Sequence, residues 1–261
     1  MFGMKFSNLP RRNFTILVSD PTETPQSGTL KTLKGSFNGL AVVGSQPSQS
    51  VNMNIKVVYI ESANIFSKRE KTRIEKSVGA VYRDTAKTFG KHMPVNFTFY
   101  RFGKKLKGFA QAKDWITLTL PKGRIDYDHL ESVLYHELHH IVRGYTEYLE
   151  SGKHFLLNSL FSEGLAMAFE IEKKSNAKRI ASCKYSRALL RKWLLIAKKE
   201  LRAPRYDYQA WFQGKGKPDR MGYRIGKYLV DEIEKHHPLC THKDLVRKSA
   251  GELLSLSKVK F

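Results

Sequence analysis

The sequence predicts an α+β fold in which a small mixed sheet and a histidine-bearing helix are followed by a mainly helical lobe. Three observations support this prediction. Apolar runs rich in β-branched and aromatic residues precede residue 121. Residues 126–144 place apolar side chains at helical spacing around a cluster of histidines. Beyond residue 163 the helical periodicity continues almost to the last residue.

The first elements alternate between strand and helix. Residues 1–51 are rich in Ser, Thr, Gly, Pro and Gln, so we expect a partly flexible arm, with short strands possible at residues 14–18 and 40–43. Residues 52–61 form a β-rich run that begins the core. Residues 67–89 then carry apolar side chains at helical intervals among many charges, which predicts an amphipathic helix.

Two further strands precede the histidine-bearing helix. Gly90 would end the helix before them. Residues 95–100 alternate between apolar and polar side chains, and residues 114–120 form a second β-rich run that Pro121 stops. We therefore predict an α+β lobe over residues 52–144.

The last part of the chain is predicted to form a helical lobe, residues 145–261. Helices are expected at residues 178–201, 223–235 and 244–257. The connection from residue 202 to residue 221 contains several Pro and Gly residues, so we expect a loop anchored by its aromatic side chains.

The strongest chemical signal is an HExxH pattern on the predicted helix 126–144. Residues four apart lie on one face of a helix, so the imidazoles of His136 and His140 can hold one Zn²⁺. Glu137 would lie beside that metal, where its carboxylate can take a proton from water. His139 is expected to support the site or lie on the surface. A chance match in ordinary histidines stays open.

A catalytic zinc site needs a third protein ligand. The long metzincin pattern is excluded, because Arg143 and Thr146 stand where it requires Gly and His. His154 and Glu163 are the remaining candidates.

Glu163 is the better candidate because apolar residues surround it, and a buried carboxylate needs a cation partner. The small residues Gly164, Ala166 and Ala168 would let its helix approach the first one closely. The alternative is an exposed glutamate at a helix start capped by Ser162.

These motifs resemble those of the gluzincin clan, and in particular a bacterial family of predicted Zn-dependent proteases catalogued among the domains of unknown function. HExxH is followed by Glu163-Gly164-Leu165-Ala166, and Gly222-Tyr223-x-x-Gly226 is similar to that family's Gly-Tyr-x-x-Gly segment. Residues 249–254 are similar to its closing helix. The resemblance covers the chain from residue 52 onward and implies a zincin-like fold with a zinc site, without naming a substrate.

Other residues have further roles under this interpretation. Peptide hydrolysis develops an oxyanion, and Tyr223 could donate a hydrogen bond to it, although a core tyrosine is equally compatible. Glu170 and Asp231 are possible carboxylates for orienting the metal-bound histidines. In related metalloproteases an edge strand binds extended peptide, and residues 109–120 could do the same, although an ordinary buried strand also fits.

Composition bounds the alternatives. The chain has 261 residues and 41% hydrophobic content, with no apolar run of membrane-spanning length and no secretory signal at its start. The two cysteines, Cys183 and Cys240, are too few for a disulfide framework. We therefore expect a cytoplasmic protein.

The net charge of +22 is the strongest anomaly of composition. Many cations lie in the predicted basic helix of residues 178–205, whose outer face could contact a polyanion weakly, although a solvated face is the more common case. The sequence thus predicts a zinc metallopeptidase acting on a peptide or protein. The competing hypothesis is a basic protein that binds nucleic acid or another polyanion, with structural zinc or none.

Overall fold

A computed structural model describes residues 16–17, 32–33, 55–60, 65–144, 155–175, 186–203 and 206–261. No helix within these ranges is long and apolar enough to cross a membrane. The described part contains a four-stranded sheet and a two-stranded one. The predicted strand at residues 40–43 lies outside the described residues.

The larger sheet has the order β3-β4-β6-β5. Strands β3 (Ile55–Ile60), β4 (Val95–Arg101) and β6 (Trp115–Leu120) are parallel, and β5 (Lys107–Ala112) runs antiparallel to β6. Its three parallel strands confirm the strands predicted at the corresponding positions. The smaller sheet pairs β1 (Ile16–Leu17) with β2 (Thr32–Leu33).

The prediction of one edge strand over residues 109–120 is wrong. The chain reverses at Lys113 and Asp114, so that Ala112 pairs with Trp115 in a hairpin. As a result, β6 lies between β4 and β5, and of the two hairpin strands it is β5 that forms an edge of the described sheet, while β3 forms the opposite edge.

Helix α1 (Lys68–Phe89) confirms the predicted amphipathic helix. Ser67 and Glu70 form a capping box at its start, and Gly90 ends it with φ 64°. Its apolar face joins the sheet and the next helix in one core cluster, which includes Ile74 and Val78.

Helices α2 (Tyr127–Arg143) and α3 (Leu156–Lys173) pack against each other. The side chain of Asp126 caps α2, and Gly144 ends it in the left-handed conformation with φ 77°, which agrees with the helix predicted over residues 126–144. Helix α3 begins at Leu156, seven residues before Glu163, and Leu156 is already buried in the core. Ser162 is therefore inside the helix, and the alternative of an exposed glutamate at a helix start is wrong.

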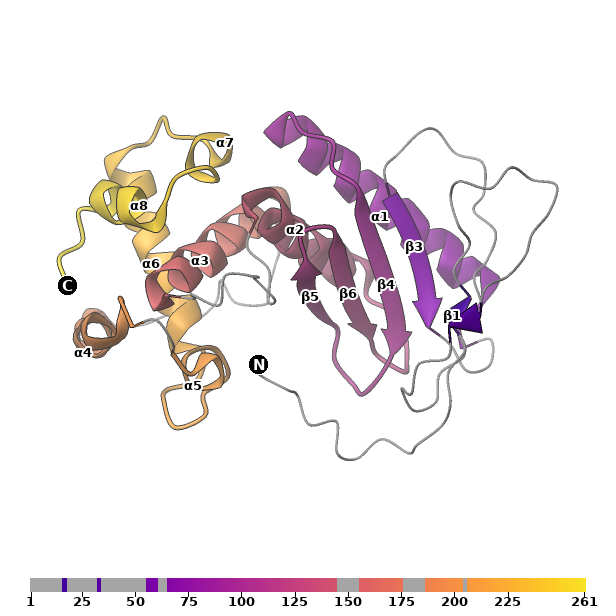
Figure 1. The fold of residues 1–261 in the computed structure, drawn as a ribbon, viewed down its shortest axis with the longest axis horizontal. Coiled ribbons are helices and arrows are strands. Elements are labelled where there is room, and N and C mark those ends of the chain that lie inside the picture. The colour runs from indigo at the N-terminus through magenta and orange to yellow at the C-terminus, as the bar shows by residue number, and fades with distance from the viewer. Residues whose placement is uncertain are drawn as a thin grey trace.

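Five helices follow α3 in the described part of the chain. They are α4 (Arg187–Glu200), α5 (Tyr208–Gln213), α6 (Met221–His236), α7 (His242–Leu245) and α8 (Ala250–Ser257). In Figure 1 the large sheet and α1 lie on one side, α2 and α3 in the middle, and these helices on the other side.

Two predictions for this part are wrong in detail. The expected loop of residues 202–221 contains α5, which buries Trp211 and Phe212. The single helix expected over residues 244–257 is broken, because Ser249 and Glu252 form a capping box that starts α8.

Helices α3 and α6 approach each other closely at two glycines. A Cβ atom at Gly164 would lie 2.3 Å from the carbonyl oxygen of Gly226, and one at Gly226 would lie 2.2 Å from that of Leu160. Gly164 therefore faces α6, and the prediction that it lets α3 approach α2 is wrong. Both α3 and α6 belong to a second core cluster, separate from that of the sheet. The domain boundary at residue 144 stays a prediction.

Candidate metal centre

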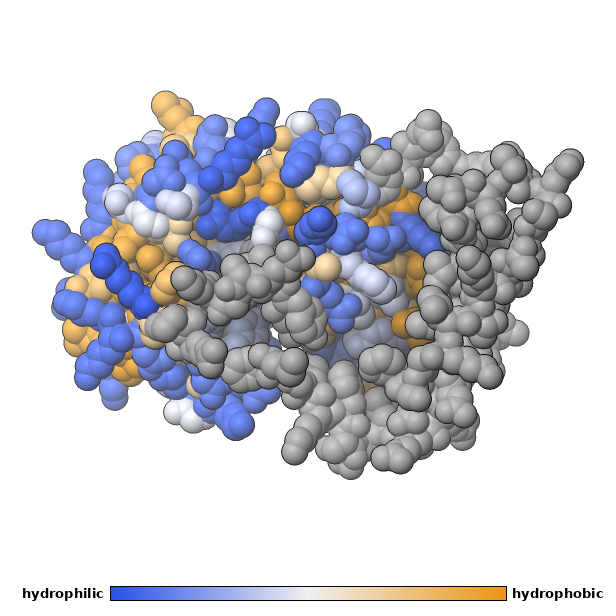
Figure 2. Space-filling view, in the orientation of Figure 1, coloured by the Kyte–Doolittle hydropathy of each residue, from blue (hydrophilic) through white to orange (hydrophobic). Residues whose placement is uncertain are grey.

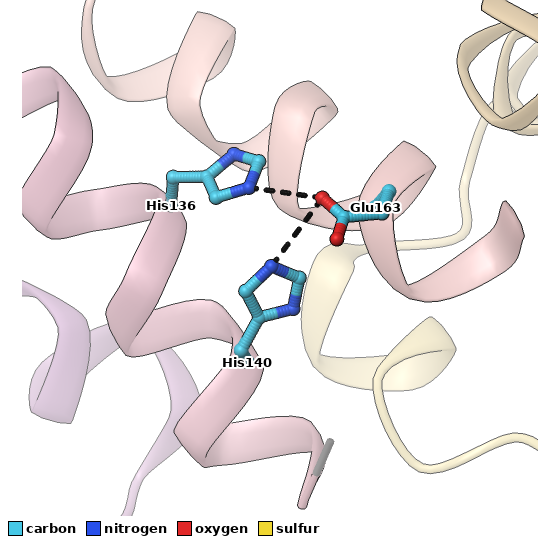
Figure 3. Close-up of side chains that lie close together, drawn as sticks. All are labelled: His136, His140 and Glu163. Carbon is cyan, nitrogen blue, oxygen red and sulfur yellow. Dashed lines mark hydrogen bonds and ion pairs between the residues drawn. The ribbon is translucent and has the colours of Figure 1, made fainter. Parts of the chain in front are cut away.

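His136 and His140 lie one turn apart on α2, and each is at most 4% exposed. Their rings meet edge to face with centroids 4.8 Å apart. Figure 3 shows both imidazoles directed toward Glu163 of α3. The sequence spacing of four residues thus places both rings on the side of α2 that faces α3.

Glu163 brings a carboxylate between the two rings. Its Oε2 atom lies 3.2 Å from His136 Nε2 and 3.5 Å from His140 Nε2. Ligand atoms about 2.0–2.1 Å from a tetrahedral zinc stand about 3.4 Å from one another, so these separations fit zinc. One ligand atom from each residue lies within 4.8 Å of the others, and all three residues are buried.

The charges around the site favour a cation at its centre. Burial lowers the pKa of His136, but hydrogen bonds to Glu163 and Glu170 and the charge of Glu137 outweigh burial and raise that pKa to about 10. Burial also acts to raise the pKa of Glu163, yet His140 and His136 hold it well below its ordinary value. Three buried carboxylates therefore surround two imidazoles, a donor set that suits a divalent metal ion.

Glu170, one of the two proposed orienting carboxylates, contacts the far side of His136. Its Oε2 atom lies 3.2 Å from His136 Nδ1, and its Oε1 atom accepts a hydrogen bond from the Ser132 hydroxyl. A proton held at Nδ1 leaves Nε2 available to a metal. Asp231, the other candidate, forms an ion pair with Lys227 on α6.

Glu137 is held between α2 and the edge strand. Its Oε2 atom accepts a hydrogen bond of 3.0 Å from the backbone N–H of Ala110 in β5. A Cβ atom at Gly108 would lie 2.6 Å from Glu137 Cγ, so only glycine lets β5 come this close. Glu137 is 4% exposed.

Tyr208 is a site residue that the sequence analysis missed. Its hydroxyl donates a hydrogen bond of 3.3 Å to Oε1 of Glu163. The other carboxylate oxygen, Oε2, is the one that lies between the imidazoles. The ring of Tyr208 stacks on Phe212 with centroids 4.7 Å apart. Tyr223 packs edge-on against the same phenylalanine, with centroids 5.1 Å apart. No local sequence signal links α5 to Glu163, because the contact depends on how distant helices pack.

His139 does not support the metal centre and does not lie on the surface, which corrects the prediction for this residue. It is fully buried beside Phe89, Phe169 and His242, with ring centroids 5.7–6.2 Å away. Neither ring nitrogen has a hydrogen-bond partner among the residues that the structure describes, and burial lowers the pKa of His139 well below the ordinary value. His154, the other candidate for third ligand, lies outside the described residues.

Comparison with known families supports this geometry. Residues 75–255 match a family described as "Predicted Zn-dependent protease". The chain belongs to this family. Zinc is accordingly the metal expected at the buried His–His–Glu group, and the resemblance drawn from the motifs is confirmed. A search of curated proteins found no match.

Solved structures show the fold. An aminopeptidase N family protein from Idiomarina loihiensis superposes with a TM-score of 0.51 at 12% identity, covering 93% of this chain and 46% of that one. A two-domain M1 zinc metallopeptidase mutant bound to L-arginine gives a TM-score of 0.42 at 15% identity, covering 78% and 44%. This chain thus spans less than half the length of either protein. The predicted α+β, zincin-like fold is confirmed.

Proposed function

We propose that this protein is a zinc-dependent peptide-bond hydrolase of the gluzincin type, with His136, His140 and Glu163 as the metal ligands. The observation that carries the proposal is the position of Glu163 Oε2, 3.2 Å and 3.5 Å from the two imidazole nitrogens. A carboxylate buried between two histidines of one helix needs a cation to offset its charge, and a bound zinc ion supplies it. Membership in a family of predicted Zn-dependent proteases supports the proposal.

The base in this proposal is Glu137. Zinc, when bound, supplies Lewis acidity that makes water a stronger acid and polarises a substrate carbonyl. The Glu137 carboxylate is kept in place by the Ala110 N–H and lies next to His136 in the chain. We assign it to take a proton from the attacking water and to pass it to the leaving amine.

The substrate would bind along β5. Among the described strands, β5 pairs with β6 alone, and the N–H of Ala110 donates to Glu137. An extended peptide added at this edge would therefore run past the proposed base. Peptide-length dependence tests this: cleavage should be faster for extended substrates of several residues than for dipeptides, and equal rates would contradict edge pairing.

Glu137→Gln tests the function. The amide oxygen can still accept from Ala110 N–H, so the fold and the metal ligands should survive, while the proton acceptor is lost. We expect cleavage of an unfolded protein substrate to fall by about 100-fold or more at unchanged zinc content. Full activity of this variant, or wild-type cleavage that resists a chelator, would contradict the proposal.

Tyr223 stays our proposed donor to the oxyanion, and Tyr208 is now a second phenol close to the site. Replacing the donor with Phe should lower kcat by about 100-fold with little change in KM, because the bond forms only in the transition state. The matched pair Tyr223→Phe and Tyr208→Phe decides between them. A kcat within a few-fold of wild type for Tyr223→Phe would remove it from the mechanism.

The competing hypothesis of a polyanion-binding protein has one supporting observation, the net charge of +22. Steeply salt-dependent DNA binding by protein that contains no zinc would favour it. The weak polyanion contact through residues 178–205 and the cytoplasmic location also stay proposals. Residues 186–203 of that segment are described and contain α4.

A further inference from the structure

A cavity of about 800 Å³ lies in the helical part of the molecule and includes no residue of the metal centre. It is bounded by the start of α3, the end of α4, α8 and the residues that follow α8. The backbone N–H of Leu157 donates to the carbonyl of Leu201 over 3.4 Å, which joins α3 and α4 at this point. Figure 2 shows apolar surface between hydrophilic side chains on the side of the molecule where α4 and α8 lie.

Apolar side chains make up most of the lining. They come from four segments of the chain and include Leu157, Leu201, Leu254, Val259 and Phe261. Leu201 is 7% exposed, and the other four are partly buried. Ser255 adds one hydroxyl group. Such a lining suits a hydrocarbon, which needs no hydrogen bonds, better than a peptide, whose backbone groups need several.

Three cations stand at the same cavity. Lys198, Lys199 and Arg202 are exposed at the end of α4, and none of them forms an ion pair with a carboxylate of the described residues. Glu200, between them in sequence, is already engaged by the indole N–H of Trp211 at 2.7 Å and by Lys217 at 2.9 Å. The cavity therefore has apolar walls and three cations for which the described residues offer no ion pair.

We propose that this cavity binds a single-chain aliphatic carboxylate of the fatty-acid type. The carboxylate would pair with Lys198, Lys199 and Arg202, whose donors match an anionic head group. The hydrocarbon chain would cover Leu157, Leu254 and Phe261. A volume of about 800 Å³ lies within the range of small-molecule sites.

The test is calorimetric titration of the full chain with sodium dodecanoate below its micelle concentration. Shortening the chain to decanoate and octanoate should lower affinity by about fourfold for each methylene removed. Undecyltrimethylammonium has the same alkyl tail and the opposite charge, so it should bind at least about tenfold more weakly. Equal binding of the two amphiphiles, or no saturable binding of dodecanoate, would overturn the proposal.

A matched pair of variants locates the site. The double change Lys198→Glu and Lys199→Glu should lower dodecanoate affinity at least about tenfold. Lys104→Glu with Lys105→Glu alters the net charge equally in an exposed loop and should leave affinity within twofold. Equal losses in both variants would mean that overall charge attracts the ligand, which contradicts a site at the cavity.

Two further measurements exclude other occupants. Leu254→Gln keeps the three cations and should also lower the affinity for dodecanoate. Its melting temperature is compared with that of the wild type to show that the fold is intact. Anionic vesicles containing phosphatidylglycerol test the alternative of a membrane surface. Binding to vesicles without binding to free dodecanoate would overturn the proposal, whereas dodecanoate binding that vesicles do not compete away would support it.

Discussion

His139 and His140 are neighbours in the sequence and lie in opposite environments. His140 faces a carboxylate of α3, with its Nε2 atom 3.5 Å from Glu163 Oε2. His139 lies among Phe89, Phe169 and His242, and within the described part of the chain neither of its ring nitrogens has a hydrogen-bond partner. One residue turns a helix by about 100°, so adjacent side chains are sorted to different sides. The identity of a histidine therefore says little until its side of the helix is known.

The same sorting acts on α3. Glu163 faces the histidines of α2, while Gly164 faces α6, where its missing side chain admits the backbone of Gly226. One helix thus carries the proposed metal ligand Glu163 on one side and a close helix contact on the other. Charged side chains therefore meet where Glu163 faces the histidines of α2, which we call the polar side of the pair. The side of α3 that carries Gly164 packs against α6.

The largest effect should come from removing the carboxylate on the polar side. Glu163→Ala should lower zinc affinity by more than the roughly 100-fold typical of losing a supporting hydrogen bond, because a direct ligand is removed. His139→Phe is the matched control, with unchanged zinc affinity and equal or greater stability, because two unpaired buried nitrogens are removed. Competition titration with a zinc chelator measures both.

If His139→Phe lowered zinc affinity as much as Glu163→Ala, the distinction between the two sides of α2 would be wrong. Unchanged affinity in Glu163→Ala would instead redirect the assignment of the third ligand to His154, which lies outside the described residues.

A smaller effect on zinc should follow from Glu170→Gln. This change keeps the shape of the side chain but removes the charge that faces His136 Nδ1. We expect zinc affinity to fall about 10–100-fold, since such supporting carboxylates orient the ligand and raise its basicity. Asp231→Asn is the control, because Asp231 pairs with Lys227 and should leave zinc affinity unchanged. Equal effects of the two changes would contradict the proposed role of Glu170.

A substitution at the contact between α3 and α6 should lower the stability of the fold, whether or not it also affects metal binding. Gly226→Ala would force a Cβ atom to 2.2 Å from the Leu160 carbonyl, and we expect a loss of at least about 2 kcal/mol in the free energy of unfolding. A Cβ atom at Gly251 in α8 would meet nothing within 4 Å, so Gly251→Ala should be neutral or slightly stabilising. Denaturant unfolding of the zinc-free variants tests this, and equal stabilities would show that the α3–α6 contact can relax.

Local features of the sequence were enough to predict much of this arrangement. The start and end of α2 follow from Asp126 and Gly144, and the HExxH spacing alone places His136 and His140 on one face. Glu163 could be proposed because apolar residues flank it, although the small residue beside it packs on α6 instead of α2.

Contacts between distant elements could not be predicted in the same way. The hydrogen bond from Tyr208 to Glu163 joins residues 45 apart, and the one from Ala110 to Glu137 depends on β5 forming a separate strand. The hairpin turn at Lys113 and Asp114 contains no glycine or proline. The sequence therefore predicts one strand where the structure has two, β5 and β6.

Zinc analysis of protein purified without added metal tests the central assignment most directly. We predict about one zinc per wild-type chain and much less in Glu163→Ala prepared in parallel. Wild-type protein that contains no zinc and binds none on addition, or equal zinc content in the two proteins, would contradict it.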